Sequence, residues 1–365
     1  MIDSKGIMMK RIAFFQSELS VGGIQKSLVN LLRSIDYDKY EVDLYLSKND
    51  NFWNVTFPER LNVHFLKKTP KLFSFIPFET AKSILRYNFD AGREYDLAVD
   101  FNSYQCSCAI GAQTVPAKYR VMWIHNNVEI KYANEWKYRV LWFFFKEKFK
   151  YYDEFVPVSE SITEPFKEMS GIKDKPFTVI QNIINVDEIR EKMEHIPENF
   201  SVSSEYLNFV ALGRLCHQKG YDIMLEEFAK ALNRRRDIRL YIIGDGPDEE
   251  ALKRQCGKLG IEKNVFFLGR KSNPYCYMKL MDAFISTSRY EGQPLNIMEA
   301  MAVGLPLYCS KNLESYTEGL KGYDDIAAAI VSAEREQKHP DDLTAYNSKI
   351  LDSIYKLAER AEKNS

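Results

Sequence analysis

The sequence has few residues of the types that hold metal ions. Among 365 residues there are only five histidines and six cysteines, and no two cysteines have the paired C-x-x-C spacing. Structural zinc sites are built from such cysteines and histidines at short, regular spacings. The composition therefore predicts no metal site and no disulfide framework, and we expect reduced thiols.

The chain also lacks an excess of one charge and a long hydrophobic run. Its 50 basic and 51 acidic residues leave a net charge of -1, so no overall field attracts nucleic acid. No window approaches the ~20 apolar residues of a membrane span. The first apolar run, residues 12–15, is too short for a signal peptide. We expect a cytoplasmic protein that binds no nucleic acid.

What the chain does have is a regular alternation of apolar runs and helical patterns, over a length that suits two domains. Buried strands are predicted at residues 11–16, 41–46, 95–99, 120–124 and 154–158, and again at 208–212, 238–243, 265–268, 283–287 and 305–309. Strands that alternate with helices predict an α/β fold, with parallel sheets covered by helices on both faces.

A polar stretch, residues 184–205, separates the two halves of this pattern. We therefore expect a first domain over residues 1–185 and a second over residues 186–340. Residues 341–365 are charged, with apolar residues at helical spacing, and are predicted to form a C-terminal amphipathic helix.

Two glutamates stand where doubly wound sheets bind phosphorylated ligands. Glu291 follows the apolar run 282–287, and Pro294 fits the first position of a helix that Gly304 ends. Glu291 is therefore expected on a strand-to-helix loop and Glu299 on the second turn of the helix. The free N–H groups of the first turn face the same place, at the carboxyl end of a strand. Alternatively, the two carboxylates are a chance feature of a solvated helix.

A second motif, residues 213–220, places two cations after the strand at 208–212. Gly213 lets the backbone turn there. Arg214 offers a planar fork to phosphate oxygens, and Lys219 a mobile point charge. Such cations suit a ligand that carries phosphate groups. The alternative is two solvated basic residues in a loop.

Two features of the first half fit the same kind of site. Gly22 and Gly23 follow the first strand, where a glycine pair either admits a ligand close to the backbone or simply makes a turn. His125 ends the strand at 120–124 and is either a ligand contact or a satisfied structural residue. Neither half contains G-x-G-x-x-G, so a dinucleotide cofactor is not expected, and we expect no other cofactor.

Together these motifs resemble those of the retaining glycosyltransferases of family four, which have the GT-B fold. Residues 291–299 match the Glu-x7-Glu signature of that family, and residues 213–220 match its G-R-x(4)-K-G element. The resemblance implies two Rossmann-like domains that face each other across a cleft, with the C-terminal helix crossing back to the first. It also implies metal-independent transfer from a nucleotide sugar, expected to be UDP-linked, to a glycan or lipid-linked acceptor in cell-surface polysaccharide synthesis, such as a capsule.

The resemblance also assigns roles. It places Glu291 at the donor sugar, Glu299 at the ribose hydroxyls, and Arg214 and Lys219 at the leaving diphosphate. The catalytic residues that it implies are His125, Arg214, Lys219 and Glu291. The donor-binding residues that it implies are Gly22, Gly23, Gly213, Arg214, Lys219, Glu291, Gly292, Gln293, Pro294, Leu295 and Glu299.

One region departs from the family pattern. After Pro306 the family usually continues into a glycine-rich loop with an acidic residue, whereas residues 310–325 are shorter and only loosely similar. Two alternatives therefore stay open. One is a non-catalytic or weakly active GT-B subunit that supports a partner transferase, and the other is a GT-B sugar-nucleotide epimerase.

Two segments of the first half, residues 67–78 and 132–152, mix aromatic and basic residues. Such a mixture suits the surface of an anionic membrane, and would place the protein at the inner face of the cell membrane. The alternative is core helices whose lysines extend along the apolar surface to reach water.

Overall fold

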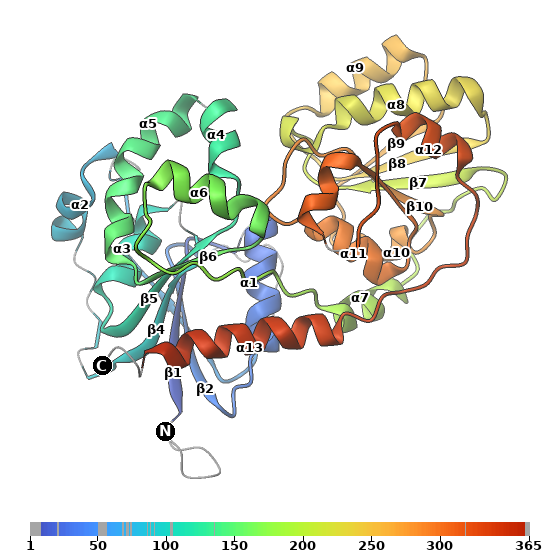
Figure 1. The fold of residues 1–365 in the computed structure, drawn as a ribbon. Helices are drawn as coiled ribbons and strands as arrows, with labels where there is room; N and C mark the ends of the chain where they lie inside the picture. The colour runs from blue at the N-terminus through green and yellow to red at the C-terminus, as the bar shows by residue number, and fades with distance from the viewer. Residues whose placement is uncertain are drawn as a thin grey trace. The chain divides into compact units, whose positions relative to one another are not determined.

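The computed structural model describes residues 9–361 except 20–21, 50–56, 68, 71–72, 74, 86, 88, 91, 103–104, 135 and 318. The chain forms two compact units (Figure 1). The first combines Met1–Ile183 with Tyr346–Ser365, and the second is Ile184–Ala345. Each unit is built on a parallel sheet, as predicted, and each sheet has six strands where the sequence predicted five.

The sheet of the first unit has the strand order β3-β2-β1-β4-β5-β6. Its strands are β1 (Lys10–Gln16), β2 (Tyr40–Leu46), β3 (Leu61–Phe65), β4 (Tyr95–Asp100), β5 (Ala117–Ile124) and β6 (Glu154–Pro157). Its helices are α1 (Gly23–Ser34), α2 (Phe78–Ile84), α3 (Cys106–Thr114), α4 (Val128–Asn134), α5 (Trp136–Phe145), α6 (Thr163–Ser170) and most of α13 (Thr344–Arg360). The order reverses between β1 and β4, which is the doubly wound topology of Rossmann-like domains.

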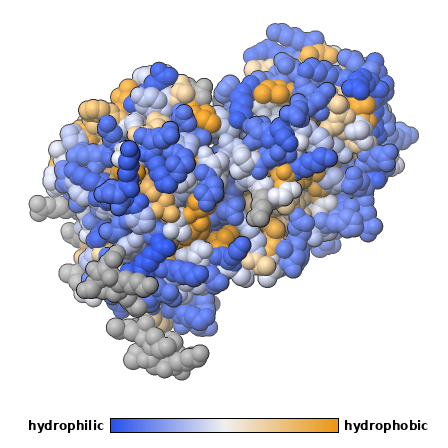
Figure 2. All heavy atoms as spheres, viewed as in Figure 1, coloured by the Kyte–Doolittle hydropathy of each residue, from blue (hydrophilic) through white to orange (hydrophobic). Residues whose placement is uncertain are grey.

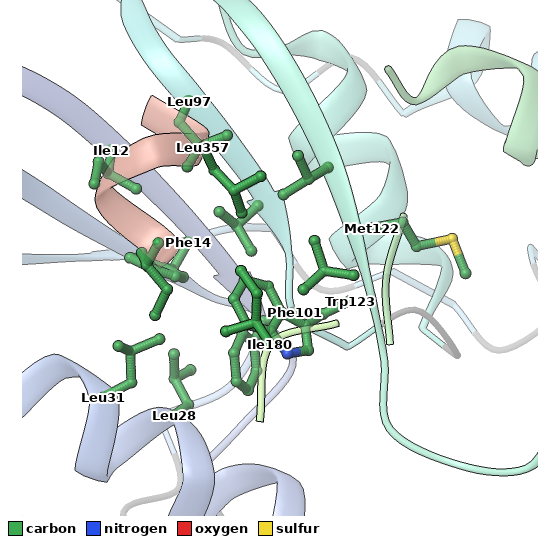
Figure 3. Packing of buried hydrophobic residues seen from close by; sticks show 14 of the residues in the cluster. Ile12, Phe14, Leu28, Leu31, Leu97, Phe101, Met122, Trp123, Ile180 and Leu357 are labelled. Atoms are coloured by element: carbon green, nitrogen blue, oxygen red, sulfur yellow. The ribbon is translucent and has the colours of Figure 1, made fainter. Parts of the chain in front are cut away.

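The middle of strand β1 is buried on both faces, and this is why residues 12–15 form an unbroken apolar run. Ile12 and Phe14 point into a core that includes Leu28 of α1 and Leu357 of α13 (Figure 3). The residues between and after them, Ala13 and Phe15, pack in a second cluster with side chains of α3. Alternate residues of one strand thus fill the cores on opposite faces of the sheet.

The C-terminal helix α13 belongs to the first unit, as the predicted crossing of this helix requires. Ile350, Ile354 and Leu357 have the spacing of one helix face and are buried in the core of this unit. Tyr355 stacks on Tyr40 with ring centroids 4.3 Å apart. Near the end of the helix, Arg360 forms an ion pair with the buried carboxylate of Glu154.

The sheet of the second unit repeats the topology, in the order β12-β11-β10-β7-β8-β9. Its strands are β7 (Leu207–Leu212), β8 (Ile238–Ile243), β9 (Val265–Gly269), β10 (Ala283–Ser286), β11 (Leu307–Ser310) and β12 (Gly322–Tyr323). Its helices are α7 (Val186–Met193), α8 (Tyr221–Arg234), α9 (Glu249–Leu259), α10 (Tyr275–Met278), α11 (Leu295–Val303) and α12 (Ile326–Ser332). Among the described residues, no helix has both the length and the apolar composition needed to cross a membrane.

Candidate functional site

The two motifs of the second half follow neighbouring strands. Residues 213–220 come directly after β7, and Glu291 comes five residues after β10. The sheet order reverses between these two strands, and ligands of doubly wound folds bind at the carboxyl ends of strands at such a point. The fold thus brings together two segments that lie about 70 residues apart in the sequence.

Lys219 and Glu291 are in direct contact at this point. Nζ of Lys219 lies 2.6 Å from Oε1 of Glu291, and the two side chains are only 19% and 6% exposed. Gln218 adds hydrogen bonds from Nε2 to the carbonyl of Tyr290 at 3.1 Å and to Oε2 of Glu291 at 3.4 Å. The other cation of the motif, Arg214, is exposed on the same loop. The site therefore holds a sheltered carboxylate next to an ammonium and an exposed guanidinium.

Two glycines allow this loop to lie against its neighbours. Gly220 has a φ of 64°, and a Cβ there would clash with the carbonyl of Thr287. It is the N-cap residue of α8. Gly246 packs so closely on the backbone of Leu215 that a side chain would collide with it. The backbone N–H of Leu215 donates to the carbonyl of Asp245 at 2.8 Å, so the Gly244–Gly246 segment packs against the 213–220 loop.

Glu299 lies on the second turn of α11, as predicted, and is buried. The hydroxyl of Tyr275, from α10, donates to its Oε1 at 3.3 Å. The helix begins at Leu295, so the prediction that Pro294 is its first residue is wrong. Pro294 is the residue before the helix because its ψ of 85° is not helical. Gly304 ends the helix with a left-handed φ of 85°, as predicted.

Other predicted donor-binding residues surround the start of α11. Gly292 and Gln293 are buried between Glu291 and the helix. Nε2 of Gln293 lies 3.1 Å from the sulfur of Met298. Gly213 directly follows β7, and its carbonyl accepts a hydrogen bond from the hydroxyl of Tyr221 at 3.2 Å.

Three predicted site residues belong to the first unit. Gly22 precedes α1 and Gly23 is its first residue, while the preceding Val21 lies outside the described residues. His125 follows β5 and is buried, and its Nε2 donates to the carbonyl of Phe101 at 3.0 Å. Burial lowers the pKa of His125 to about 3, so the imidazole is neutral near pH 7.

A buried polar cluster that was not predicted from the sequence lies next to Phe101, the hydrogen-bond partner of His125. Asp100 ends β4 directly before Phe101, and the hydroxyl of Tyr152 donates to its Oδ2 at 2.6 Å. Burial raises the pKa of Asp100, while the buried Lys148 acts in the opposite direction. No local motif marks this cluster, since its members come from separate elements.

The fold and the position of the site are those of enzymes that bind phosphorylated ligands, and comparisons with known proteins find glycosyltransferases. The family model described as "Glycosyl transferases group 1" matches residues 192–364. An uncharacterized glycosyltransferase of Haemophilus influenzae is 25% identical over 315 residues, which cover 85% of this chain and 84% of that protein. Residues 192–364 are therefore similar to the group 1 glycosyltransferases, and the two parallel sheets have the topology of the GT-B fold.

Other relatives match over shorter stretches. An uncharacterized glycosyltransferase of Methanocaldococcus jannaschii is 26% identical over 198 residues, 51% of this chain and 47% of that protein. The alpha-monoglucosyldiacylglycerol synthase of Streptococcus pneumoniae is 29% identical over 156 residues, 40% of this chain and 35% of that protein. The matched part thus spans less than half the length of these two relatives.

Solved structures share the whole fold at low sequence identity. HepE of Anabaena, crystallised with UDP-glucose, has a TM-score of 0.63 and 17% identity, and the match covers 95% of this chain and 99% of that one. This likeness concerns the two Rossmann-like sheets and their connections.

Proposed function

We propose that this protein is a retaining glycosyltransferase that uses a UDP-linked sugar and no metal ion. Its acceptor in this proposal is a glycan or a lipid-linked glycan in the synthesis of a cell-surface polysaccharide or glycolipid. The observation that carries the proposal is the contact between Lys219 and Glu291 at the point where the sheet order reverses. A nucleotide-sugar donor has its diphosphate and its sugar side by side, so a cation and a carboxylate in contact suit neighbouring groups of one donor.

The charges in the site suit the proposed chemistry. As the bond from the sugar to the diphosphate breaks, the bonding electrons leave with the diphosphate. The acceptor hydroxyl attacks the same face of the sugar and passes its proton to the departing diphosphate. Lys219 and Arg214 would balance the growing negative charge, and Glu291 would balance the positive charge that develops on the sugar. The name of the synthase from Streptococcus pneumoniae, and the UDP-glucose in the HepE crystal, support the choice of acceptor and donor classes.

The proposed independence from metal rests on these cations. Metal-dependent sites need oxygen ligands that are available to the ion. The sequence contains one Asp-x-Asp pair, Asp36 and Asp38, in the turn between α1 and β2. Asp36 forms an ion pair with Lys39 at 2.7 Å, and Asp38 forms one with Arg60. These carboxylates are engaged in surface pairs of the first unit.

We expect the purified chain to turn over a UDP-sugar equally well with EDTA and with added magnesium. A panel of nucleotide sugars is first screened by thermal shift, because a donor at ~100 times its Kd stabilises the folded protein by about 2.7 kcal/mol. Turnover of the selected donor is then measured with and without EDTA. Loss of turnover in EDTA that magnesium or manganese restores would contradict the metal-independent mechanism.

The two alternative functions give different results in the same assay. An epimerase converts the donor into a second nucleotide sugar without any acceptor. A supporting subunit binds the donor but turns it over only when its partner transferase is added. Release of UDP that depends on the acceptor, by this chain alone, distinguishes the proposed function from both.

The proposal of a lipid-linked acceptor draws support from α5, which exposes an apolar stripe. Trp136, Val140 and Phe143 are 70%, 46% and 68% exposed and lie at i, i+4 and i+7, on one side of the helix. Arg139 and Lys146, also exposed, carry positive charge beside them. Figure 2 shows hydrophobic atoms over this part of the first unit, at the upper left of the view.

The second aromatic-basic segment meets the first in the fold. The backbone N–H of Phe78, at the start of α2, donates to Oε2 of Glu147 at 2.7 Å. Lys82 of α2 lies 4.9 Å from the ring centre of Tyr151. Ile84, at the end of α2, is 61% exposed. Residues 68, 71, 72 and 74 of this segment lie outside the described residues.

One basic residue of the expected surface does not belong to it. Lys148 is buried, with its charge near Asp100, so the prediction that it contributes to a basic surface is wrong. The sequence pattern treated all lysines between 132 and 152 alike. Lys148 lies in the short 3-10 segment Lys146–Tyr151, and spacing alone does not show which side of such a segment is buried.

We expect the protein to sediment with anionic vesicles and much less with neutral ones. Each basic residue near an anionic surface adds ~1 kcal/mol, and the attraction weakens with salt. The double variant Trp136→Ser/Phe143→Ser should bind less, while Ile196→Ser, which removes an exposed apolar side chain of the second unit, should bind like the wild type. Equal binding to both vesicle types, or binding to neither, would contradict the prediction and leave the apolar stripe of α5 with a purely structural role.

A further inference from the structure

Arg289 links the loop that carries Glu291 to the start of α8. Its guanidinium binds both carboxylate oxygens of Asp222, with Nη1 to Oδ1 at 2.7 Å and Nη2 to Oδ2 at 2.5 Å. The same Nη1 donates to the carbonyl of His217 at 2.8 Å. The backbone N–H of Arg289 donates to the carbonyl of Gln218, also at 2.8 Å. Four hydrogen bonds from one residue thus tie the Glu291 loop to the segment that carries Lys219.

Asn312 ties the same loop from its other side. Its Nδ2 donates to the carbonyl of Ser288 at 3.0 Å and to that of Arg289 at 3.2 Å. Asn312 lies in the 3-10 segment Lys311–Tyr316, within the region whose sequence departs from the family pattern. This region therefore contacts the backbone of the Glu291 loop.

These contacts matter because the loop between β10 and α11 has no regular secondary structure of its own. The direction of the Glu291 carboxylate depends on side chains that hold the loop backbone. A displacement of about 1 Å at a reacting group can cost ~10²-fold in rate. Asp222 and Asn312 contact neither Lys219 nor Glu291 in any hydrogen bond of the described residues, so their influence on the pair passes through the loop.

We infer that Asp222 and Asn312 are positioning residues for the Lys219–Glu291 pair, acting through Arg289 and the loop backbone. The inference rests on the proposed transferase activity of this pair. If Asn312 has this function, the region after Ser310 contributes to the activity. The bidentate ion pair of Asp222 and Arg289 is then needed for the full kcat.

The test compares variants of Asp222 and Asn312 with a matched control. Asp222→Asn keeps the shape of the side chain but loses the charge, and Asn312→Ala removes the second tie. Both are expected to lower kcat tenfold to a hundredfold, with donor KM changed by less than about threefold, since the donor contacts themselves remain. Asp237→Asn removes the ion pair of Asp237 with Arg235, elsewhere in the same unit, and should keep the wild-type kcat.

The charge-reversed double variant Asp222→Arg/Arg289→Asp distinguishes positioning from a general need for stability. It restores an ion pair at the same place, and its kcat should exceed that of Arg289→Asp alone. Melting temperatures are measured for all variants, and kinetics are run well below the lowest of them. Wild-type kcat in Asp222→Asn and Asn312→Ala, with only their melting temperatures lowered, would overturn the inference. Failure of the wild type itself to transfer sugar would instead overturn the proposed function.

Discussion

Replacing Glu291 with glutamine is expected to lower kcat by ~10²–10³, with a much smaller change in donor KM. Removing one preorganised group that stabilises charge in a transition state costs about this much in other enzymes. In the proposed reaction, the carboxylate meets a positive charge that develops only as the bond to the diphosphate breaks. Its contribution is therefore larger in the transition state than in the ground state, which lowers kcat more than it raises KM.

The contact with Lys219 makes the choice of substitution important. Glutamine can still accept a hydrogen bond from Nζ of Lys219, which lies 2.6 Å from Oε1 of Glu291. Alanine would leave a mostly buried ammonium without its partner, and removing one partner of a buried pair costs up to 3–5 kcal/mol of stability. The 19% exposure of Lys219 should keep the loss below that range. Glu291→Gln is therefore the cleaner test of catalysis, and Glu291→Ala also reports on folding.

Steady-state kinetics on Glu291→Gln provides the measurement, with folding checked by circular dichroism. Glu226→Gln is the control, because Glu226 is exposed on α8 and its substitution changes the net charge equally. Wild-type kcat and KM in Glu291→Gln would show that the carboxylate has only a structural role, and the proposed function would lose its central residue.

The sequence allowed the core strands to be predicted because they are apolar on both sides. Residues 12–15 and 240–243 lie in sheets covered on both faces, so every position of these two runs is apolar. The edge strand β3 was missed, since Asn62 and His64 interrupt the pattern where one strand side meets solvent. Helix α7 was missed because its apolar residues sit in an otherwise charged stretch.

The sequence predicts on which loops and helices the candidate site residues lie, but not which of them are in contact. Gly213, Lys219 and Glu291 stand in motifs that local spacing reveals. Their contact depends on β7 and β10 being neighbours, which follows from the strand order and not from any local pattern. Arg289 and Asp222 are 67 residues apart and Tyr275 and Glu299 are 24 apart, and none of these pairs has a short motif of its own. Long-range pairs of this kind appear only once the sheet is assembled.

Replacing Glu299 with glutamine should change a different kinetic constant from the one that Glu291→Gln changes. In the proposed function its carboxylate holds the ribose hydroxyls of the donor, far from the bond that breaks. Such a contact exists in the ground state and in the transition state alike, so its loss mainly raises donor KM. A hydrogen bond to a charged group contributes ~1.5–3 kcal/mol, which corresponds to a tenfold to hundredfold rise.

The hydroxyl of Tyr275 supplies the control for this prediction. It donates to Oε1 of Glu299 at 3.3 Å, so part of any effect of Glu299→Gln could come from a disturbed contact with α10. Tyr275→Phe removes that hydrogen bond and keeps the carboxylate. We expect it to raise donor KM far less than Glu299→Gln does, with kcat near wild type in both variants.

If Tyr275→Phe raised KM as much, Glu299 would serve to hold α10 in place. If Glu299→Gln kept the wild-type KM, the carboxylate would not bind the donor, because a ribose contact cannot be lost without weakening the affinity for the nucleotide.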